Sequence, residues 1–566
     1  MKKTVAIFIF NIFSCLLFAQ SVNVDDVLNV GKNKPFAFNG GISAGSILYN
    51  GNQQGRQPWT YYINGNLNTK IYGLIDIPIS INLTNLGKNM SYPSLPNRLS
   101  LHPTYKWITA HVGDVSMTFS PYTLNGHQFT GGGVDLTPDK FKISAMGGRL
   151  LRKMGYSAEN SSVMPNYERW GYGAKVQYDA AKFSVGMIYF GAQDKIDNGM
   201  VQVADSLNIR PMQNSAFSWN VGLNIIKNLN FTVEYGLSLL TRDSRAERDG
   251  SSLINKVFSN RTSTHVYNAL NAKLNYQLLK NTIGIGYERI DPEYQTLGAY
   301  YFNNDYENIT LNFSRPFLKD DKANVALSFG IQRDNLDNTK EESTNRYVGS
   351  VNLNYNPMED LQTSLNFSTF QSYRNLKSQF DYINEMSPYD NMDTLRFTQL
   401  SQNLDASVMY TFQKSETRNQ RLNLLASYQQ AADKQGEISL PGNVTRFINS
   451  ALGYGLTLVP QNINVTASVN GTYNYATMLK TYTLGPMAGV TGSFLEKTLT
   501  CGLSVAYNMN FMESAVQAKV LNCRANAAYR LFKKHNLTAN IVWQNRNLKA
   551  KKTDAVTTTV AYSYSF

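Results

Sequence analysis

The chain has 566 residues, of which 42% are hydrophobic and 16% charged, with a formal net charge of +13. No Pro/Ser-rich linker or charge block divides it, which favours one continuous architecture over several soluble domains. Beyond the amino-terminal segment, no run approaches the roughly 18 apolar residues of a spanning helix, so any membrane crossing must be made by strands. The basic residues are scattered along the chain, which argues against a nucleic-acid partner.

The amino terminus has the pattern of an exported protein. Lys2 and Lys3 precede a mostly apolar run over residues 5–19, and Ala19 is a small residue at a plausible cleavage point. This pattern predicts a secretory signal peptide over residues 1–20. A short periplasmic segment, residues 21–35, would then lead into a barrel over residues 36–566.

The first predicted strands cover residues 36–49, 59–72, 74–86, 98–102, 107–117 and 128–136. Tight turns are expected near Gly73 and at residues 104–106. Within this part, residues 113–133 read GDVSMTFSPYTLNGHQFTGGG. Proline and repeated glycine let a backbone turn sharply and approach other groups closely.

This run is the best internal candidate for a constriction. We predict a constriction or docking loop built from Pro121, Tyr122, Asn125, Gly126, His127, Gly131, Gly132 and Gly133. The alternative is an ordinary extracellular loop whose glycines ease a bend or bulge.

A resemblance covers the same region. The stretch KWITAHVGDVSMTFSPYTLNGHQFTGGGVDLTPDKFKISAMGGRLLRK, residues 106–153, resembles a recurrent segment of large, uncharacterised outer-membrane β-barrels of Bacteroidota. The resemblance implies a place in the cell outer membrane, with transport or a role beside secretion and surface-protein machinery as settings. It implies no catalytic residue.

Period-two alternation continues downstream, in residues 231–239, 323–332, 462–473 and 537–544. Apolar residues on one face and polar residues on the other are typical of strands between hydrocarbon and water. This periodicity predicts that Glu234, Asn464, Thr466, Ser468, Asn470 and Asn540 face the lumen.

Two kinds of connection alternate along the chain. Short turns, such as Pro138-Asp139 and Lys280-Asn281, alternate with mostly longer polar connections, such as residues 194–213 and 374–394. This alternation is typical of an up-and-down barrel with short periplasmic turns and longer extracellular loops. We predict an all-β, transmembrane antiparallel barrel of about 26 strands, within 22 to 26, with both termini periplasmic.

The last two hairpins complete the pattern. Cys501 and Cys523 fall about opposite each other in the hairpin predicted around residues 511–513, so a cross-strand disulfide and two unbonded lipid-facing thiols are both open. The final strand is apolar on one face and small or polar on the other. Its apolar face holds Val556, Val560, Tyr562, Tyr564 and Phe566, and its other face Thr557, Thr559, Ala561, Ser563 and Ser565.

The sequence offers little chemistry. Ser100 with His102 and Ser263 with His265 share a strand face, but neither pair has a carboxylate two positions further along to orient the imidazole. No His or Cys spacing predicts a metal site, and no phosphate loop predicts a nucleotide site. We therefore expect no enzyme, no metal and no cofactor.

The lumen of a barrel with about 26 strands must be narrowed by some other element, because an open pore of this width would leak solutes and barrels of about 22 strands are already plugged. The sequence favours a passive or partner-gated conduit, either porin-like or an export channel, with a polar lumen. The alternative is a non-conducting structural or assembly barrel that anchors a secretion or surface-protein complex. Its expected partners are outer-membrane lipid and lipopolysaccharide, with a plug or surface protein as a further candidate.

Overall fold

The computed structural model describes residues 34–51, 57–85, 98–155, 165–196, 209–248, 260–318, 322–339, 345–369, 372–375, 397–432, 444–476, 479–513, 515–549 and 551–566. The predicted signal peptide lies outside these residues. No helix in them is long and apolar enough to cross a membrane.

The described residues form strands joined by turns and loops. The first half of the wall consists of β1 (Phe36–Gly51), β2 (Trp59–Ile71), β3 (Ile75–Thr84), β4 (Arg98–Leu101), β5 (Thr104–Tyr105), β6 (Ile108–Thr118), β7 (Asn125–Leu136), β8 (Phe141–Leu151), β9 (Glu168–Asp179), β10 (Phe183–Lys195), β11 (Gln213–Ile226), β12 (Leu229–Thr241), β13 (Thr264–Leu278) and β14 (Asn281–Ile290). The second half consists of β15 (Tyr306–Phe317), β16 (Ala323–Arg333), β17 (Asn345–Met358), β18 (Leu361–Ser368), β19 (Ser372–Asn375), β20 (Phe397–Lys414), β21 (Arg418–Ala432), β22 (Val444–Leu458), β23 (Ile463–Ala476), β24 (Leu479–Phe494), β25 (Leu499–Met512), β26 (Ala515–Leu531), β27 (His535–Leu548) and β28 (Lys551–Ser565).

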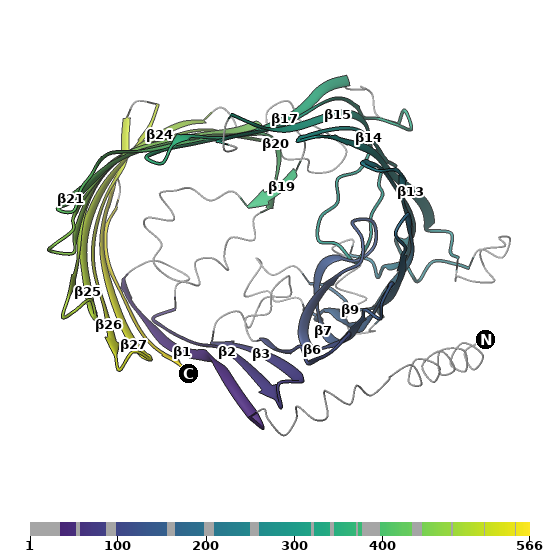
Figure 1. Cartoon of the computed structure of the whole chain (residues 1–566), viewed down its shortest axis with the longest axis horizontal. Helices are drawn as coiled ribbons and strands as arrows, with labels where there is room; N and C mark the ends of the chain where they lie inside the picture. The colour runs from purple at the N-terminus through teal and green to yellow at the C-terminus, as the bar shows by residue number, and fades with distance from the viewer. Residues whose placement is uncertain are drawn as a thin grey trace.

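The strands close into one antiparallel barrel (Figure 1). Each strand pairs with its neighbours in chain order, and β1 pairs with β28 from Gly41↔Ser565 to Gly51↔Ala555. Because β4 with β5, and β18 with β19, are two segments of one strand, the barrel has 26 strands. The predicted fold is confirmed.

The outer face is apolar. Across β14, β15 and β16 the register joins Ile285 to Leu311 and Leu311 to Phe329, and all three side chains are exposed although large and hydrophobic. Contiguous exposed apolar surface on every side of a barrel is the surface that lipid covers. The apolar residues predicted on the last strand, such as Val560 and Tyr562, lie on this same exposed face.

Aromatic side chains form clusters on the outside, two of which lie on β8 to β12. Near the short turns, the rings of Phe141, Tyr178 and Phe183 contact one another in turn. A longer run crosses four strands from β9 to β12, through contacts among Tyr172, Tyr189, Phe217, Trp219 and Tyr235. Such bands are typical of membrane–water interfaces.

The two ends of the barrel differ as predicted. The short turns carry left-handed residues, among them Tyr72, Lys106, Asp139 and Asn228, which is the backbone that two- to four-residue hairpin turns require. The opposite end carries the longer connections, such as residues 291–305 between β14 and β15. We call these the short-turn end and the long-loop end.

The predicted pairing of Cys501 opposite Cys523 is wrong. Cys501 pairs with Ala527 and Cys523 with Val505, so the cysteines are four positions apart along the ladder and not opposite each other. The cause is the turn, which is centred near residue 514 because β25 extends to Met512 and β26 begins at Ala515. Both thiols are free.

Candidate functional site: an inner lobe and a polar wall

The part of the β6–β7 hairpin that carries its connecting turn leaves the wall and bends into the lumen (Figure 1). β6 pairs with β4 only at Leu101↔Val112 and Ser100↔Gly113, and β7 pairs with β8 only from Thr130 onward. Gly113 has a φ of 103°, a conformation that favours glycine, and a Cβ there would overlap the carbonyl of Leu99. Residues 114–129 therefore form a two-stranded finger whose strands pair with the neighbouring wall strands only at its base.

The connection between β14 and β15, residues 291–305, meets this finger. We call it the inner loop, and the finger and inner loop together the inner lobe. Asn125 N donates to Gly298 O over 2.9 Å, and Gln128 N donates to the Tyr300 hydroxyl over 2.7 Å. The inner loop thus occupies the edge of β7 that β8 does not cover.

Two further hydrogen bonds join the turn of the finger to the inner loop. The Thr296 hydroxyl donates to Thr123 O over 2.8 Å, and the Tyr294 hydroxyl donates to Tyr122 O over 2.8 Å. From the wall, the side-chain nitrogen of Lys175 on β9 donates to Phe119 O over 3.2 Å. The finger is therefore held at its tip as well as at its base.

A hydrophobic core fills the space between lobe and wall. The finger and inner loop contribute Phe119, Leu124, Phe129, Tyr294 and Leu297, and the wall contributes residues such as Ile188, Phe190 and Leu240. Tyr294, Leu124 and Phe190 are 0% exposed. At roughly 1.5–3 kcal/mol for each large side chain buried, this core holds the lobe far more strongly than its polar contacts do.

Two wall glutamates lie under the lobe. Glu288 accepts from the Tyr122 hydroxyl at 3.0 Å and from Asn271 Nδ2 at 3.1 Å, while Glu234 accepts from the Ser218 hydroxyl at 2.5 Å. Burial, followed by the negative charge of Glu288, holds the pKa of Tyr122 well above its usual range. Tyr122 therefore remains a hydrogen-bond donor throughout the ordinary pH range.

A glycine makes room for this contact. Gly236 of β12 lies beneath Tyr122, and a Cβ built on it would meet the Tyr122 Cβ at 2.7 Å. Any larger residue there would push the finger away from the wall, because real Cβ atoms do not approach so closely.

The residues predicted for the constriction separate into three groups. Pro121 and Tyr122 lie in the turn of the finger, while Asn125, Gly126 and His127 begin β7 on its returning strand. His127 is buried and its ring packs 4.2 Å from that of Tyr300. Gly131, Gly132 and Gly133 lie nearer the base of the finger, where β7 pairs with β8 as well as with β6 and is part of the wall.

The wall from β20 to β28 has a different inner face. On β23, Asn464, Thr466, Ser468 and Asn470 alternate with exposed residues such as Val465 and Val469, and therefore face the lumen. Their register neighbours are also polar or small: Thr457 donates to Asn464, and Thr472 donates to Asn449, over 3.1 and 3.2 Å. Asn540 lies on the same face between Asn526 and Thr559.

Glu234 was predicted on the same grounds, but its surroundings differ. It also faces inward, yet it lies under the inner lobe, near enough to influence the hydroxyls of Tyr122 and Tyr294. The six predicted lumen-facing residues thus belong to two different inner surfaces.

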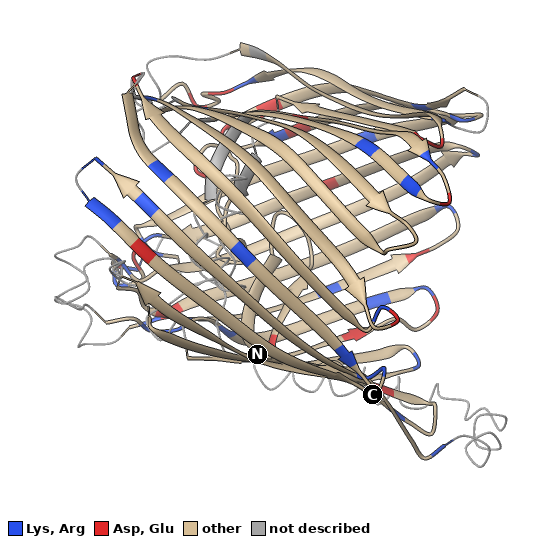
Figure 2. Cartoon of the chain, turned by 90° about the vertical axis from the view of Figure 1, so that its left-hand side faces the viewer, with Lys and Arg blue, Asp and Glu red and all other residues tan. Residues whose placement is uncertain are grey.

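Charges are sparse on the polar wall. Figure 2 shows this side, with Lys, Arg, Asp and Glu widely separated along the strands. The charged side chains on the lumen face of β20 to β28 include Asp405, Arg421, Arg524 and Arg546. Amide and hydroxyl groups therefore form most of this surface, with a small excess of positive charge.

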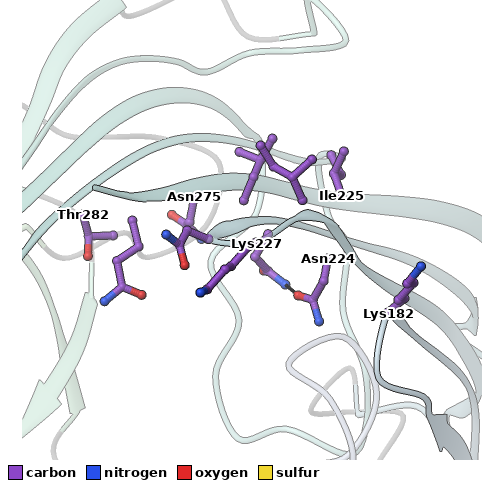
Figure 3. Close-up of a pocket in the computed structure, with 11 residues that line it drawn as sticks. Lys182, Asn224, Ile225, Lys227, Asn275 and Thr282 are labelled. Atoms are coloured by element: carbon purple, nitrogen blue, oxygen red, sulfur yellow. Dashed lines mark hydrogen bonds between the residues drawn. The ribbon is translucent and has the colours of Figure 1, made fainter. Parts of the chain in front are cut away.

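A basin of about 710 Å³ lies at the short-turn end of β10 to β14 (Figure 3). Asn224 accepts from Asn230 over 2.9 Å at its floor, and Asn275 and Thr282 line its far side. Lys182 and Lys227 supply its charge. Ile225, Ile226 and Leu229 also line the basin, so its surface is mixed polar and apolar.

No protein-family model and no curated protein sequence matches the chain. Solved structures similar to it include the P pilus usher (PapC) translocation pore, at 12% identity over 94% of this chain and 99% of the other, with a TM-score of 0.38. The FrpB iron transporter from Neisseria meningitidis (F5-1 variant) gives 10% identity over 95% and 83%, with a TM-score of 0.38. A mutant of Rh. blastica porin gives 11% identity over 56% and 98%, with a TM-score of 0.27.

Sequence reasoning missed the inner loop, which supplies half of the lobe. Its signal is faint: Tyr294, Leu297 and Phe302 are apolar residues in a connection that would otherwise be polar. Apolar residues in such a loop indicate that it packs against another part of the protein, but they do not identify that part.

Proposed function

We propose that this chain is an outer-membrane conduit whose lumen is narrowed on one side by its inner lobe and conducts along its polar wall. The amide- and hydroxyl-lined inner face of β20 to β28 carries the proposal. Such a surface favours water and hydrophilic solutes, and its few charges give weak selectivity. The short-turn end would face the periplasm.

The conduit is either passive or gated by a partner. The lobe supports a gate, because it is a separately packed element that a partner could displace from its core. The alternative function is a structural or assembly barrel that does not conduct and anchors a secretion or surface-protein complex. The same lobe supports this alternative, since a partner seated against it would close the part of the lumen that the lobe leaves open.

Single-channel recording from the purified mature chain in planar bilayers separates these functions. Discrete conductance steps with a weak anion preference in a salt gradient are expected of the conduit. A silent barrel that retains heat-modifiable β structure, and that co-purifies with a stoichiometric partner, would contradict the conduit and favour the structural role.

A further inference from the structure

A chain of polar side chains crosses four strands below the inner lobe. His102, in the link between β4 and β5, points its Nδ1 at the Nδ1 of His111 on β6, 2.8 Å away. The other nitrogen of His111, Nε2, lies 2.8 Å from Asp135 Oδ2 on β7. The second oxygen of Asp135 accepts from the Ser144 hydroxyl of β8 at 2.5 Å.

The protons of this chain can be assigned from its acceptors. An ionised Asp135 only accepts hydrogen bonds, so His111 donates its proton from Nε2. The Nδ1 of a neutral His111 then carries a lone pair that is aimed at His102. The two Nδ1 atoms thus face each other across 2.8 Å, and a single proton, donated by His102, lies between them.

A carboxylate that holds the far nitrogen of a histidine is the usual support of a metal ligand. It fixes the ring orientation and tautomer and raises the basicity of the ligating nitrogen. Here Asp135 does this for His111, and Ser144 in turn fixes Asp135. The backbone N of His102 donates to Pro78 O over 2.9 Å, which anchors the second ring.

An acidic residue adds to the case. Asp76 of β3 faces Thr104 of β5, in the row of lumen-facing residues next to the histidine pair. Its Oδ1 is buried and has no hydrogen-bond partner among the described residues. A buried carboxylate oxygen left in this way attracts a cation or a bound water.

We propose that His102 and His111 bind a divalent transition-metal ion, of the class that prefers imidazole, through their Nδ1 atoms. Metal–nitrogen bonds of about 2.0–2.1 Å place two ligands on a tetrahedral ion roughly 3.3 Å apart. The two rings now meet nearly end to end, with centroids 5.1 Å apart, so both must tilt and separate slightly to admit the ion. The proton between the rings leaves when the metal enters.

The remaining coordination positions would be filled from the lumen and not by the protein. The described residues contain no group of three or more His, Cys, Asp or Glu side chains placed to hold a metal. Water from the lumen, or a donor atom carried by a solute, would complete the shell. Binding through two protein ligands is weak and exchangeable, which suits an ion in transit better than a structural metal.

Zn²⁺ binding to the full mature barrel in detergent, measured by calorimetry, tests the proposal. One saturable site is expected, with His102→Ala and His111→Ala each weakening it at least tenfold and Asp135→Asn weakening it 10- to 100-fold. His535→Ala is the matched control, because that imidazole bonds Tyr562 at the short-turn end and lies outside the cluster. Ca²⁺, which prefers oxygen ligands, should not compete.

Two results would overturn the site. One is an absence of saturable Zn²⁺ binding by the wild-type barrel, and the other is unchanged binding by His111→Ala. Heat-modifiability of each variant shows whether it has folded, and Asp135→Asn, which keeps the shape of the side chain, covers the case in which an alanine variant does not. None of these measurements depends on whether the barrel conducts.

Discussion

The wall from β6 to β15 and the wall from β20 to β28 are built from the same alternating strands, yet their inner faces differ. The first presents apolar residues such as Ile188 and Leu240, which the inner lobe covers. The second presents Asn, Ser and Thr, which can remain in water. Outward faces are apolar on both, so the solvent on each side of the wall, and not strand propensity, decides what each face carries.

Among the substitutions that distinguish the two regions, Tyr294→Ala should have the largest effect on stability and conductance. Removing a fully buried aromatic residue from the lobe core should cost about 3–5 kcal/mol, because a cavity remains. We expect the lobe to loosen, with higher conductance and faster proteolysis of the inner loop.

The matched substitution on the polar wall is Asn470→Ala. Asn470 is also buried, but it loses one hydrogen bond, to Gly485 O, and the cost should be about 1 kcal/mol. Denaturant unfolding and single-channel recording measure both variants. Equal effects on conductance would show that the lobe does not narrow the lumen.

Tyr122→Phe should have the next largest effect. It removes the hydroxyl that donates to Glu288 and should cost about 1.5–3 kcal/mol, since the acceptor is charged and half-buried. Tyr287→Phe is the control, because Tyr287 also donates to a glutamate, Glu307, but on the outer face. Both costs come from denaturant unfolding, and a cost for Tyr287→Phe as large as that for Tyr122→Phe would contradict a special role for the lobe.

Alkaline pH should loosen the lobe before it affects the polar wall. Burial raises the pKa of Tyr300 to about 12. Because the unfolded value is about 10, the neutral phenol contributes its full stability below pH 10 and loses it as the pH rises toward 12.

Tyr300→Phe should remove about 1–2 kcal/mol of this pH dependence between pH 10 and 12. The measurement is proteolysis of the inner loop as a function of pH. The same alkaline sensitivity in wild type and variant would show that another group titrates.

Arg421→Gln should give a smaller change, confined to selectivity. Arg421 lies on the lumen face of the polar wall, where charges are few. Its loss should move the reversal potential in a salt gradient toward cations, with conductance almost unchanged. Lys175→Gln, whose nitrogen bonds Phe119 O under the lobe, should leave the reversal potential where it was.

The smallest effect is expected at the outer face. Cys501 and Cys523 are four positions apart in register, which is roughly 13 Å along a strand and beyond disulfide reach. Both should react with maleimide after denaturation without reductant. A mass two hydrogens below the reduced chain would contradict this.

Much of the fold is predictable because one face of the barrel wall meets lipid and the other meets water. Alternation identifies strands such as β12, β16 and β23, and short turns identify the ends of the hairpins, so the strand number follows. Register is less accessible: a shift of two positions in the turn near residue 514 moved Cys501 from Cys523 to Ala527.

The candidate site was only half predictable. Pro121 and the glycines indicated an unusual hairpin, but nothing local showed that residues 291–305 would pack on it, because that contact joins segments about 170 residues apart in the chain. The histidine cluster was missed for the same reason, because its residues come from different strands. His102, His111, Asp135 and Ser144 meet through strand register, whereas a search along single strands finds no carboxylate beside either histidine.

The pairing of β1 with β28 has a consequence for how the barrel forms. This pairing joins positions more than 500 residues apart, such as Gly41 and Ser565, and bringing such distant segments together costs roughly 5–6 kcal/mol of chain entropy. Every other pairing among the described strands joins segments that are adjacent or nearly adjacent in chain order. The cylinder should therefore pass through an open, curved sheet whose two free edges meet last, and substitutions along β1 should slow assembly more than equivalent ones in mid-sheet.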